Sequence, residues 1–404
     1  MIGNWFRKLD YWIIFSVLGL LTLSLLALYS STAASGGANY FKYQCFWIGI
    51  GLFLMVVASL LPSRWIFFSA YWIYGLALIA LVAVIFFGST GYGATRWIRI
   101  GFLRFQPSEL AKIATILAVS RFLSSDRIQI NKIKDFGIAT LIIFLPFLLI
   151  VGQPDLGTAL VFAAMALPIY LWAGLATTNV ILIVAPFIVL LASFQYISFF
   201  LVMILLSLFL FLIRKSVVVK AINFILNISV GLITPVIWNQ LKDYQKQRIR
   251  IFWKPESDPL GAGYQVIQSK VAIGSGGFFG KGFLKGSQTQ LRFLPEQHTD
   301  FIYAVIGEEF GWLGVFGGIL LFSILLLRCV IIASQVKNKF SSLCAIGIGT
   351  VIGFHMLVNM GMTIGLLPVT GLPLPFISYG GSAMITNLIM VGLLLNFYRN
   401  RFEY

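Results

Sequence analysis

The chain has 404 residues, of which 59% are hydrophobic and only 10% are charged. A soluble domain carries about 25% charged residues, so this composition excludes a water-soluble enzyme or binding module and makes lipid the main solvent. The net charge of +16 does not indicate a nucleic-acid partner, because the basic residues are scattered over the loops between apolar runs. Membrane lipids or a membrane-bound phosphate are the partners that this pattern favours.

Long uncharged stretches predict an all-α polytopic integral membrane protein, because about 20 apolar residues in a helix cross a hydrocarbon core of about 30 Å. The first stretch, Tyr11 to Tyr29, is longer than the apolar region of a signal peptide and is predicted to be a retained anchor. The uncharged run from Leu156 to Ile213 is divided at 174–178 and 193–195, where small and polar residues gather. We expect twelve membrane-spanning helices, at 11–29, 44–62, 66–88, 108–123, 137–153, 157–174, 179–193, 196–213, 219–239, 302–328, 341–363 and 379–398.

The positions of Lys and Arg predict the orientation of these helices. With the N-terminus inside, every short inner segment except the turn at 175–178 carries a positive charge. Both termini are then cytoplasmic, and the protein is expected in the bacterial cytoplasmic membrane. An outer loop at 89–108, a large loop at 240–300 and a hairpin at 364–378 are expected on the extracytoplasmic side.

The first outer loop combines basic and aromatic side chains. Arg96 and Trp97 are followed by Ile98 and Arg99, and Glu109 and Lys112 lie three residues apart at the start of the next helix. Such a spacing places Glu109 and Lys112 on one helix face, and ionisable residues at that depth usually face the protein interior or a water-filled cavity. A lipid-headgroup rim and a binding surface for an anionic, membrane-embedded substrate both fit this pattern.

The large outer loop has a glycine-rich segment, Gly274 to Gly282, which does not match a Walker A loop. Structural turns and a phosphate cradle both stay open for it. The three cysteines lie in apolar runs, and the two histidines are far apart, so neither residue type predicts a metal site.

Asp300 follows Thr299 and opens an apolar helix at the membrane face. One reading is structural: Thr299 caps the helix, and the helix dipole favours a carboxylate in the first turn. The other reading is a general base that the helix terminus and nearby cations keep ionised. Glu308 and Glu309 lie further along the same helix, and one of them is expected to face a polar interior.

Two further segments are too rich in Pro and Gly to be helical, at 153–157 (QPDLG) and 365–382. Irregular backbone beside a membrane must be buried in protein or line a cavity. Both segments are therefore expected to pack against the rest of the chain.

Five segments together resemble the SEDS family of cell-wall polymerases: 93–97 (GATRW), 105–112 (FQPSELAK), 153–157 (QPDLG), the 243–302 loop and the 365–382 hairpin. They follow the family order through both halves of the chain. The stretch 286–291 (GSQTQL) before Phe293 is similar to the RodA, or elongation, branch rather than the FtsW, or division, branch. The resemblance implies a SEDS-type helical bundle forming a single domain over 1–404. That family usually has about ten spans, so an additional helix pair is expected within 175–235, at the periphery of the bundle.

The resemblance also implies a function. Members polymerise lipid II, the undecaprenyl-diphosphate disaccharide-pentapeptide, together with a class B penicillin-binding protein that crosslinks the product. The essential aspartate of the family matches Asp300, its Arg-Trp pair matches Arg96 and Trp97, and its charged pair matches Glu109 and Lys112. Further substrate contacts are expected in the same outer segments, at Arg248, Lys270, Glu296, His298 and Ser378.

Inverting glycosyl transfer needs a base on the acceptor hydroxyl and a cation on the departing diphosphate. Asp300 is the predicted base. Lys112, the outer arginines or a divalent cation (magnesium or manganese) can each supply the positive charge, and the sequence does not choose among them. A lipid II flippase and a non-catalytic scaffold of the elongation machinery are the alternative functions.

Overall fold

A computed structural model gives the fold and describes residues 9–33, 38–91, 94–100, 103–240, 246, 262–294 and 296–402. Most of the described chain is helical. The long helices of the first half are α2 (Tyr11–Ala33), α3 (Ala38–Leu60), α4 (Ser63–Phe87), α5 (Pro107–Ser124), α6 (Ile133–Val151) and α7 (Leu156–Trp172). The second half has α8 (Thr177–Ala192), α9 (Tyr196–Leu212), α10 (Val217–Gln240), α12 (Ala262–Ser275), α13 (Ser287–Gln290), α14 (Ile302–Gln335), α15 (Lys339–Thr363) and α16 (Gly381–Arg399).

Each predicted span coincides with a helix, and the breaks predicted near 174–178 and 193–195 separate α7, α8 and α9 as expected. Within the described residues, eight helices are long and apolar enough to cross a membrane, and α7, α8 and α9 are apolar but shorter. Helix α5 carries three charged residues, Glu109, Lys112 and Arg121. The protein is a multi-pass membrane protein, and the total of twelve spans stays a prediction.

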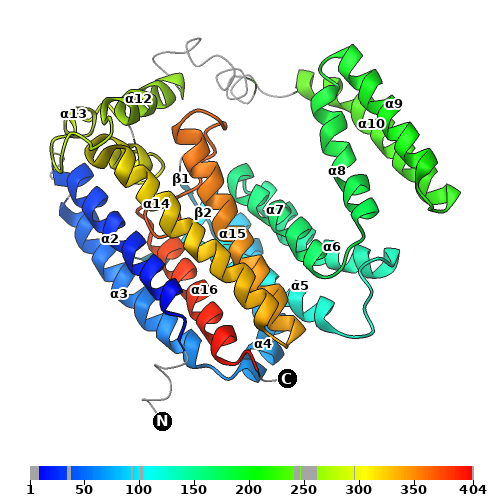
Figure 1. Cartoon of the computed structure of the whole chain (residues 1–404), viewed down its shortest axis with the longest axis horizontal. Helices are drawn as coiled ribbons and strands as arrows, with labels where there is room; N and C mark the ends of the chain where they lie inside the picture. The colour runs from blue at the N-terminus through cyan, green and yellow to red at the C-terminus, as the bar shows by residue number, and fades with distance from the viewer. Residues whose placement is uncertain are drawn as a thin grey trace.

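The centre of the bundle is α15, which packs against α14, α5 and α7, with α16 between α15 and α3 (Figure 1). The start of α2 and the end of α16 lie at one end of the bundle, and α12, α13 and the strands lie at the other (Figure 1). We call this second end the loop end. Three polar segments that connect the helices meet there, and they form the candidate site.

Helices α8, α9 and α10 pack mainly on one another and stand beside the bundle, with α7 as their neighbour (Figure 1). Their outward apolar side chains, such as Phe187, Phe200 and Phe211, are exposed and suit contact with lipid. Residues 196–235 therefore do not enter the space between α5 and the Asp300 segment. This confirms the expected peripheral position of this region.

The segment predicted as an outer loop at 89–108 contains a small antiparallel sheet, a difference from the prediction. Strands β1 (Ser89–Gly91), β2 (Ala94–Ile100) and β3 (Leu103–Phe105) pair in the order β1-β2-β3. Arg96 and Trp97 are neighbours on β2 and so point to opposite faces. Only one of these two side chains can therefore contact a given partner. The sequence did not predict this, because a loop and no strand was expected at these residues.

Helix α14 breaks at Gly311, which has φ 63° and ψ −154°. The break leaves backbone carbonyls without partners in the helix, and the glycine-rich segment supplies donors to them. Lys281 N donates to the Glu308 carbonyl and Gly282 N donates to the Glu309 carbonyl, both at 3.0 Å. A Cβ on Gly280, which has φ +79°, would lie 2.1 Å from the Glu309 carbonyl oxygen. Of the two readings of this segment, the structure therefore supports the structural one.

Candidate active site

Strand β2 is tied to the break between α6 and α7. Arg96 Nε lies 3.2 Å from Asp155 Oδ2, and Arg96 Nη2 donates to the Pro154 carbonyl at 3.3 Å. Asp155 also caps α7, because its Oδ1 and Oδ2 accept from Thr158 N at 3.2 Å and Thr158 Oγ1 at 2.9 Å. The QPDLG break thus orients Arg96 through a nearly buried carboxylate.

The hairpin at 364–378 has no helix or strand, as predicted, and it packs against the start of α7. A Cβ on Gly157 would lie 2.7 Å from the Thr370 carbonyl oxygen, so only glycine permits this contact at the start of α7. Next to α5, Gln106 N donates to Ser382 Oγ at 3.2 Å. Segments that are far apart in sequence therefore meet at the loop end.

The same hairpin holds the backbone that carries Asp300. Ser378 Oγ donates to the Thr299 carbonyl at 2.6 Å and accepts from Leu374 N at 2.8 Å. Tyr379 N donates to the His298 carbonyl at 3.0 Å. Ser378, predicted as a substrate contact, is thus engaged on both sides in holding the hairpin to the Asp300 segment.

Asn359 of α15 holds the backbone at Asp300. Its Nδ2 donates to the Asp300 carbonyl at 3.0 Å and to the Leu372 carbonyl of the hairpin at 2.8 Å. The Asp300 carboxylate lies beside Gly371, where a Cβ would be 3.6 Å from Oδ2. Burial, together with the negative charge of Glu296, raises the pKa of Asp300 to about 6, against the opposing effect of Arg96. Asp300 is therefore largely ionised at neutral pH, but it is easier to protonate than an ordinary aspartate.

This differs from the prediction in two ways. Helix α14 begins at Ile302 with Phe301 as its N-cap and no side-chain cap, so Asp300 precedes the first turn. Thr299 Oγ1 instead donates to the Glu296 carbonyl at 3.3 Å. Asp300 thus lacks the expected help from a capping Thr299, and burial outweighs the nearby cation, which moves its pKa upward rather than downward.

His298 and Glu296 line the approach to Asp300. The His298 ring lies 4.8 Å from the Tyr40 ring, and His298 Nε2 is 4.0 Å from Glu296 Oε2. Burial lowers the pKa of His298, partly offset by the charge of Glu296. His298 is therefore mainly neutral at pH 7, and the nearest formal negative charge that acts on Asp300 is Glu296.

Glu109 and Lys112 form a closed pair inside the bundle rather than an open binding site. Lys112 Nζ lies 2.8 Å from Glu109 Oε2 and 3.2 Å from His355 Nε2, and all three side chains are buried. His355 Nδ1 lies 2.8 Å from the Val351 carbonyl, so Nδ1 donates there and Nε2 is left to accept from Lys112. The predicted shared helix face is present on α5, and the contact of Lys112 with His355 links α5 to α15.

The remaining predicted contacts are more scattered. Lys270 lies on α12 against the first turn of the hairpin, where its Nζ would be 2.6 Å from a Cβ on Gly365. Trp97 is half-buried on β2. Arg248 lies outside the described residues. In the described part of the chain, no three His, Cys, Asp or Glu side chains gather in a way that could hold a metal ion.

Sequence reasoning missed His355 and Asn359. The two residues are four positions apart on α15, so they share a face, and both are buried. Polar residues at that spacing in an otherwise apolar helix were a usable signal, because buried polar groups in a membrane need partners. His355 was considered only as a metal ligand and set aside.

A family model for a cell cycle protein family, FTSW_RODA_SPOVE, matches residues 8–202 and 197–403. The peptidoglycan glycosyltransferase MrdB of Escherichia coli (strain K12) is 38% identical over 394 residues, which cover 97% of this chain and 94% of that protein. The peptidoglycan glycosyltransferase RodA of Treponema pallidum (strain Nichols) is 35% identical over 423 residues, which cover 96% of each chain.

Two solved structures are also similar. A chain described under "Structural coordination of polymerization and crosslinking by a peptidoglycan synthase complex" aligns with a TM-score of 0.76 at 31% identity, over 98% of this chain and 99% of that one. The rod shape determining protein RodA of Thermus thermophilus aligns with a TM-score of 0.66 at 26% identity, over 98% of each chain.

The buried pair makes a specific prediction about stability. Glu109→Gln leaves the Lys112 charge buried without its counter-ion, which we expect to cost about 3–5 kcal/mol. The double variant Glu109→Gln/Lys112→Met removes both charges and is expected to melt at a higher temperature than the single variant. Thermal unfolding of the purified proteins in detergent measures this, with Asp126→Asn as the control because Asp126 is exposed at the end of α5. A double variant that melts below the single variant contradicts the assignment.

Proposed function

This chain belongs to the FtsW/RodA/SpoVE cell cycle protein family, and on that premise we propose that it polymerises lipid II into glycan strands during cell elongation, with Asp300 as general base. The family model covers nearly the whole chain, and the relatives of 38% and 35% identity are peptidoglycan glycosyltransferases. The chain is a peptidoglycan glycosyltransferase. Lipid II as the substrate and the roles of individual residues are proposed.

The observation that supports this mechanism is the position of Asp300, a half-buried carboxylate where the family segments meet, with a pKa raised to about 6. A general base works best when its pKa lies near the operating pH. The carboxylate takes the proton of the acceptor sugar hydroxyl as that oxygen bonds to the anomeric carbon of the donor. The bond from this carbon to the diphosphate breaks, and the electron pair leaves with the lipid diphosphate.

The departing diphosphate gains negative charge and needs a cation nearby. Arg96 is the described cation that acts on Asp300 and is itself about 30% exposed. Lys112 is already neutralised by Glu109 and is buried. Arg96 is also paired with a carboxylate, Asp155, so the difference between the two cations is exposure, which favours Arg96 over the buried Lys112 for the diphosphate. A magnesium or manganese ion arriving with the substrate is compatible with the same site.

We also place the loop end on the extracytoplasmic side and both termini in the cytoplasm. The distribution of Lys and Arg supports this orientation. A class B penicillin-binding protein is the proposed partner, because one similar structure belongs to a complex that coordinates polymerization and crosslinking. Co-purification with that transpeptidase in detergent tests the pairing, and its absence from the purified material argues against it.

The orientation gives a labelling prediction. In a cysteine-free background, Lys285→Cys at the loop end should react with a membrane-impermeant thiol reagent in intact spheroplasts, and Ser216→Cys should react only after lysis. Both native side chains are exposed in the structure, so accessibility differs only by the side of the membrane. Swapped labelling would reverse the orientation and the site with it.

The base gives an activity prediction. Asp300→Asn keeps the size of the side chain but cannot accept the proton, and general-base catalysis contributes about 10²–10⁴-fold. We expect polymerisation of labelled lipid II by the purified protein to fall by at least about 10²-fold, with lipid II binding largely retained. Glu296→Gln is the matched control and should lose less, because Glu296 influences Asp300 through its charge and is not the proposed base. An active Asp300→Asn enzyme would remove Asp300 from catalysis, and transbilayer movement of lipid II without polymer would favour a flippase.

The raised pKa of Asp300 gives a pH prediction. Protonation removes the base, so the rate should rise with pH through about 6 and fall about tenfold per pH unit below that value. Glu296→Gln removes a negative charge that raises the pKa of Asp300, and the acidic limb should therefore move to lower pH. Initial polymerisation rates measured between about pH 4.5 and about pH 8 give the acidic limb of the unaltered protein and of Glu296→Gln. A limb at the same pH in both proteins would contradict the role of Glu296.

A further inference from the structure

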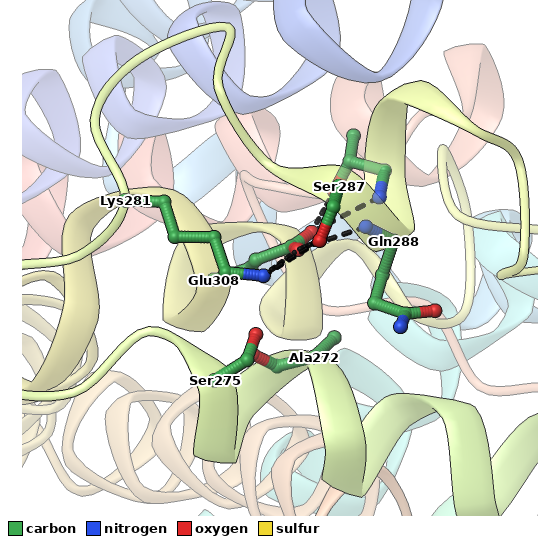
Figure 2. A network of polar contacts seen from close by, with 7 residues as sticks. Ala272, Ser275, Lys281, Ser287, Gln288 and Glu308 are labelled. Carbon is green, nitrogen blue, oxygen red and sulfur yellow. Dashed lines mark hydrogen bonds and ion pairs between the residues drawn. The ribbon is translucent and has the colours of Figure 1, made fainter.

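Glu308, in the second turn of α14, is fully buried and accepts five hydrogen bonds (Figure 2). Its Oε1 accepts from Lys281 Nζ at 2.8 Å, Ser287 Oγ at 3.3 Å and Gln288 N at 2.8 Å. Its Oε2 accepts from Thr289 N at 3.0 Å and Thr289 Oγ1 at 2.8 Å. Two carboxylate oxygens have about four lone-pair positions, so this carboxylate is saturated by donors from one short segment.

All five donors come from residues 281–289, which precede Asp300 in the chain, whereas Glu308 follows it. The contacts therefore join the two ends of the segment 289–308 and close it into a loop. Asp300 lies inside that loop. Its far side is held by Ser378 and Asn359, which bind the carbonyls of Thr299 and Asp300.

The backbone inside the loop needs this support. Arg292 has φ 60° and Glu296 has φ 50°, both in the left-handed region that side chains other than glycine rarely adopt. Such conformations persist only where the surrounding contacts determine them. Without the closure at Glu308, the strained turns on the N-terminal side of Asp300 are held by fewer contacts and can relax.

We propose that Glu308 is a positioning residue that closes the loop 289–308 and so fixes the Asp300 carboxylate in its half-buried orientation. The proposal rests on the proposed function, because it assigns Glu308 a part in presenting the base. It does not give Glu308 any contact with substrate. Lys281 stabilises the buried Glu308 carboxylate, because its Nζ lies 2.8 Å from Glu308 Oε1 and balances the negative charge.

A purely structural role of Glu308 predicts a different result. If Glu308 only stabilises the bundle, its loss lowers the amount of folded enzyme, and the surviving molecules keep the same pH dependence. If Glu308 positions the base, its loss lets water reach Asp300. The burial that raises the pKa of Asp300 is then reduced, and the acidic limb of the activity moves to lower pH.

The test compares Glu308→Gln, Lys281→Met and Thr289→Val with the unaltered protein, all as full-length chains in lipid nanodiscs. Gln at 308 turns an amide NH2 toward the donors of Gln288 or Thr289, and we expect kcat to fall by about 10–100-fold with little change in the apparent affinity for lipid II. Lys281→Met and Thr289→Val each remove one donor, so they should act in the same direction with smaller losses. Lys285→Met is the matched control, because Lys285 is an exposed lysine of the same segment without a contact to Glu308.

Two further readouts keep the outcomes separate. The acidic limb in Glu308→Gln should lie at lower pH than in the unaltered protein, and amide hydrogen exchange of residues 291–301 should be faster. Unchanged exchange and an unchanged limb in Glu308→Gln overturn the proposal, even if the rate falls. An unaltered enzyme without any acidic limb, or an active Asp300→Asn variant, instead overturns the proposed base, while the exchange result still decides whether Glu308 closes the loop. If Glu308→Gln does not fold, the two smaller variants decide the matter by the same readouts.

Discussion

Irregular backbone at the edge of a membrane must find its hydrogen-bond partners inside the protein, and the loop end of this bundle depends on that requirement. The 364–378 hairpin has no ladder of its own, so it takes partners from the Asp300 segment and from Asn359. The glycine-rich segment takes the carbonyls that the break at Gly311 leaves free. Each of these irregular segments supplies hydrogen-bond partners to another, and the candidate base Asp300 lies among them.

Two carboxylates, the buried Glu109 and the half-buried Asp300, show how the environment separates a structural group from a chemical one. Glu109 is paired at 2.8 Å with Lys112 of the same helix and is buried with it, while Lys112 also contacts His355 of α15, so the charge of Glu109 is balanced inside the bundle. Asp300 has a cation within electrostatic range but no side-chain partner of that kind among its described contacts, and burial raises its pKa instead. A carboxylate that stays ionised near neutral pH but is easy to protonate is suited to exchange protons.

The sequence predicted the helices well because membrane spans have a simple length and composition rule. Even the breaks in the uncharged run after Leu156 were placed correctly from small and polar residues. The sequence also singled out Asp300 and Arg96, through the resemblance to a known family. It did not predict the β1–β3 sheet or the position of α12, because short elements outside the membrane carry no comparable length signal. The direction of the Asp300 pKa shift was also missed, since it depends on burial by segments distant in the chain.

The helices at the edge of the bundle have a consequence for the surrounding lipid. Helices α8 and α9 have 16 and 17 residues, which at 1.5 Å per residue gives about 24–26 Å. A typical hydrocarbon core is about 30 Å thick, so these two helices are too short to match it when upright. As predicted spans, they would require the bilayer beside them to thin to meet their ends, whereas the longer α2 and α3 require no such adjustment. The predicted spans therefore imply a thinner bilayer beside α8 and α9 than beside α2 and α3, which favours neighbours with short spans next to α8 and α9.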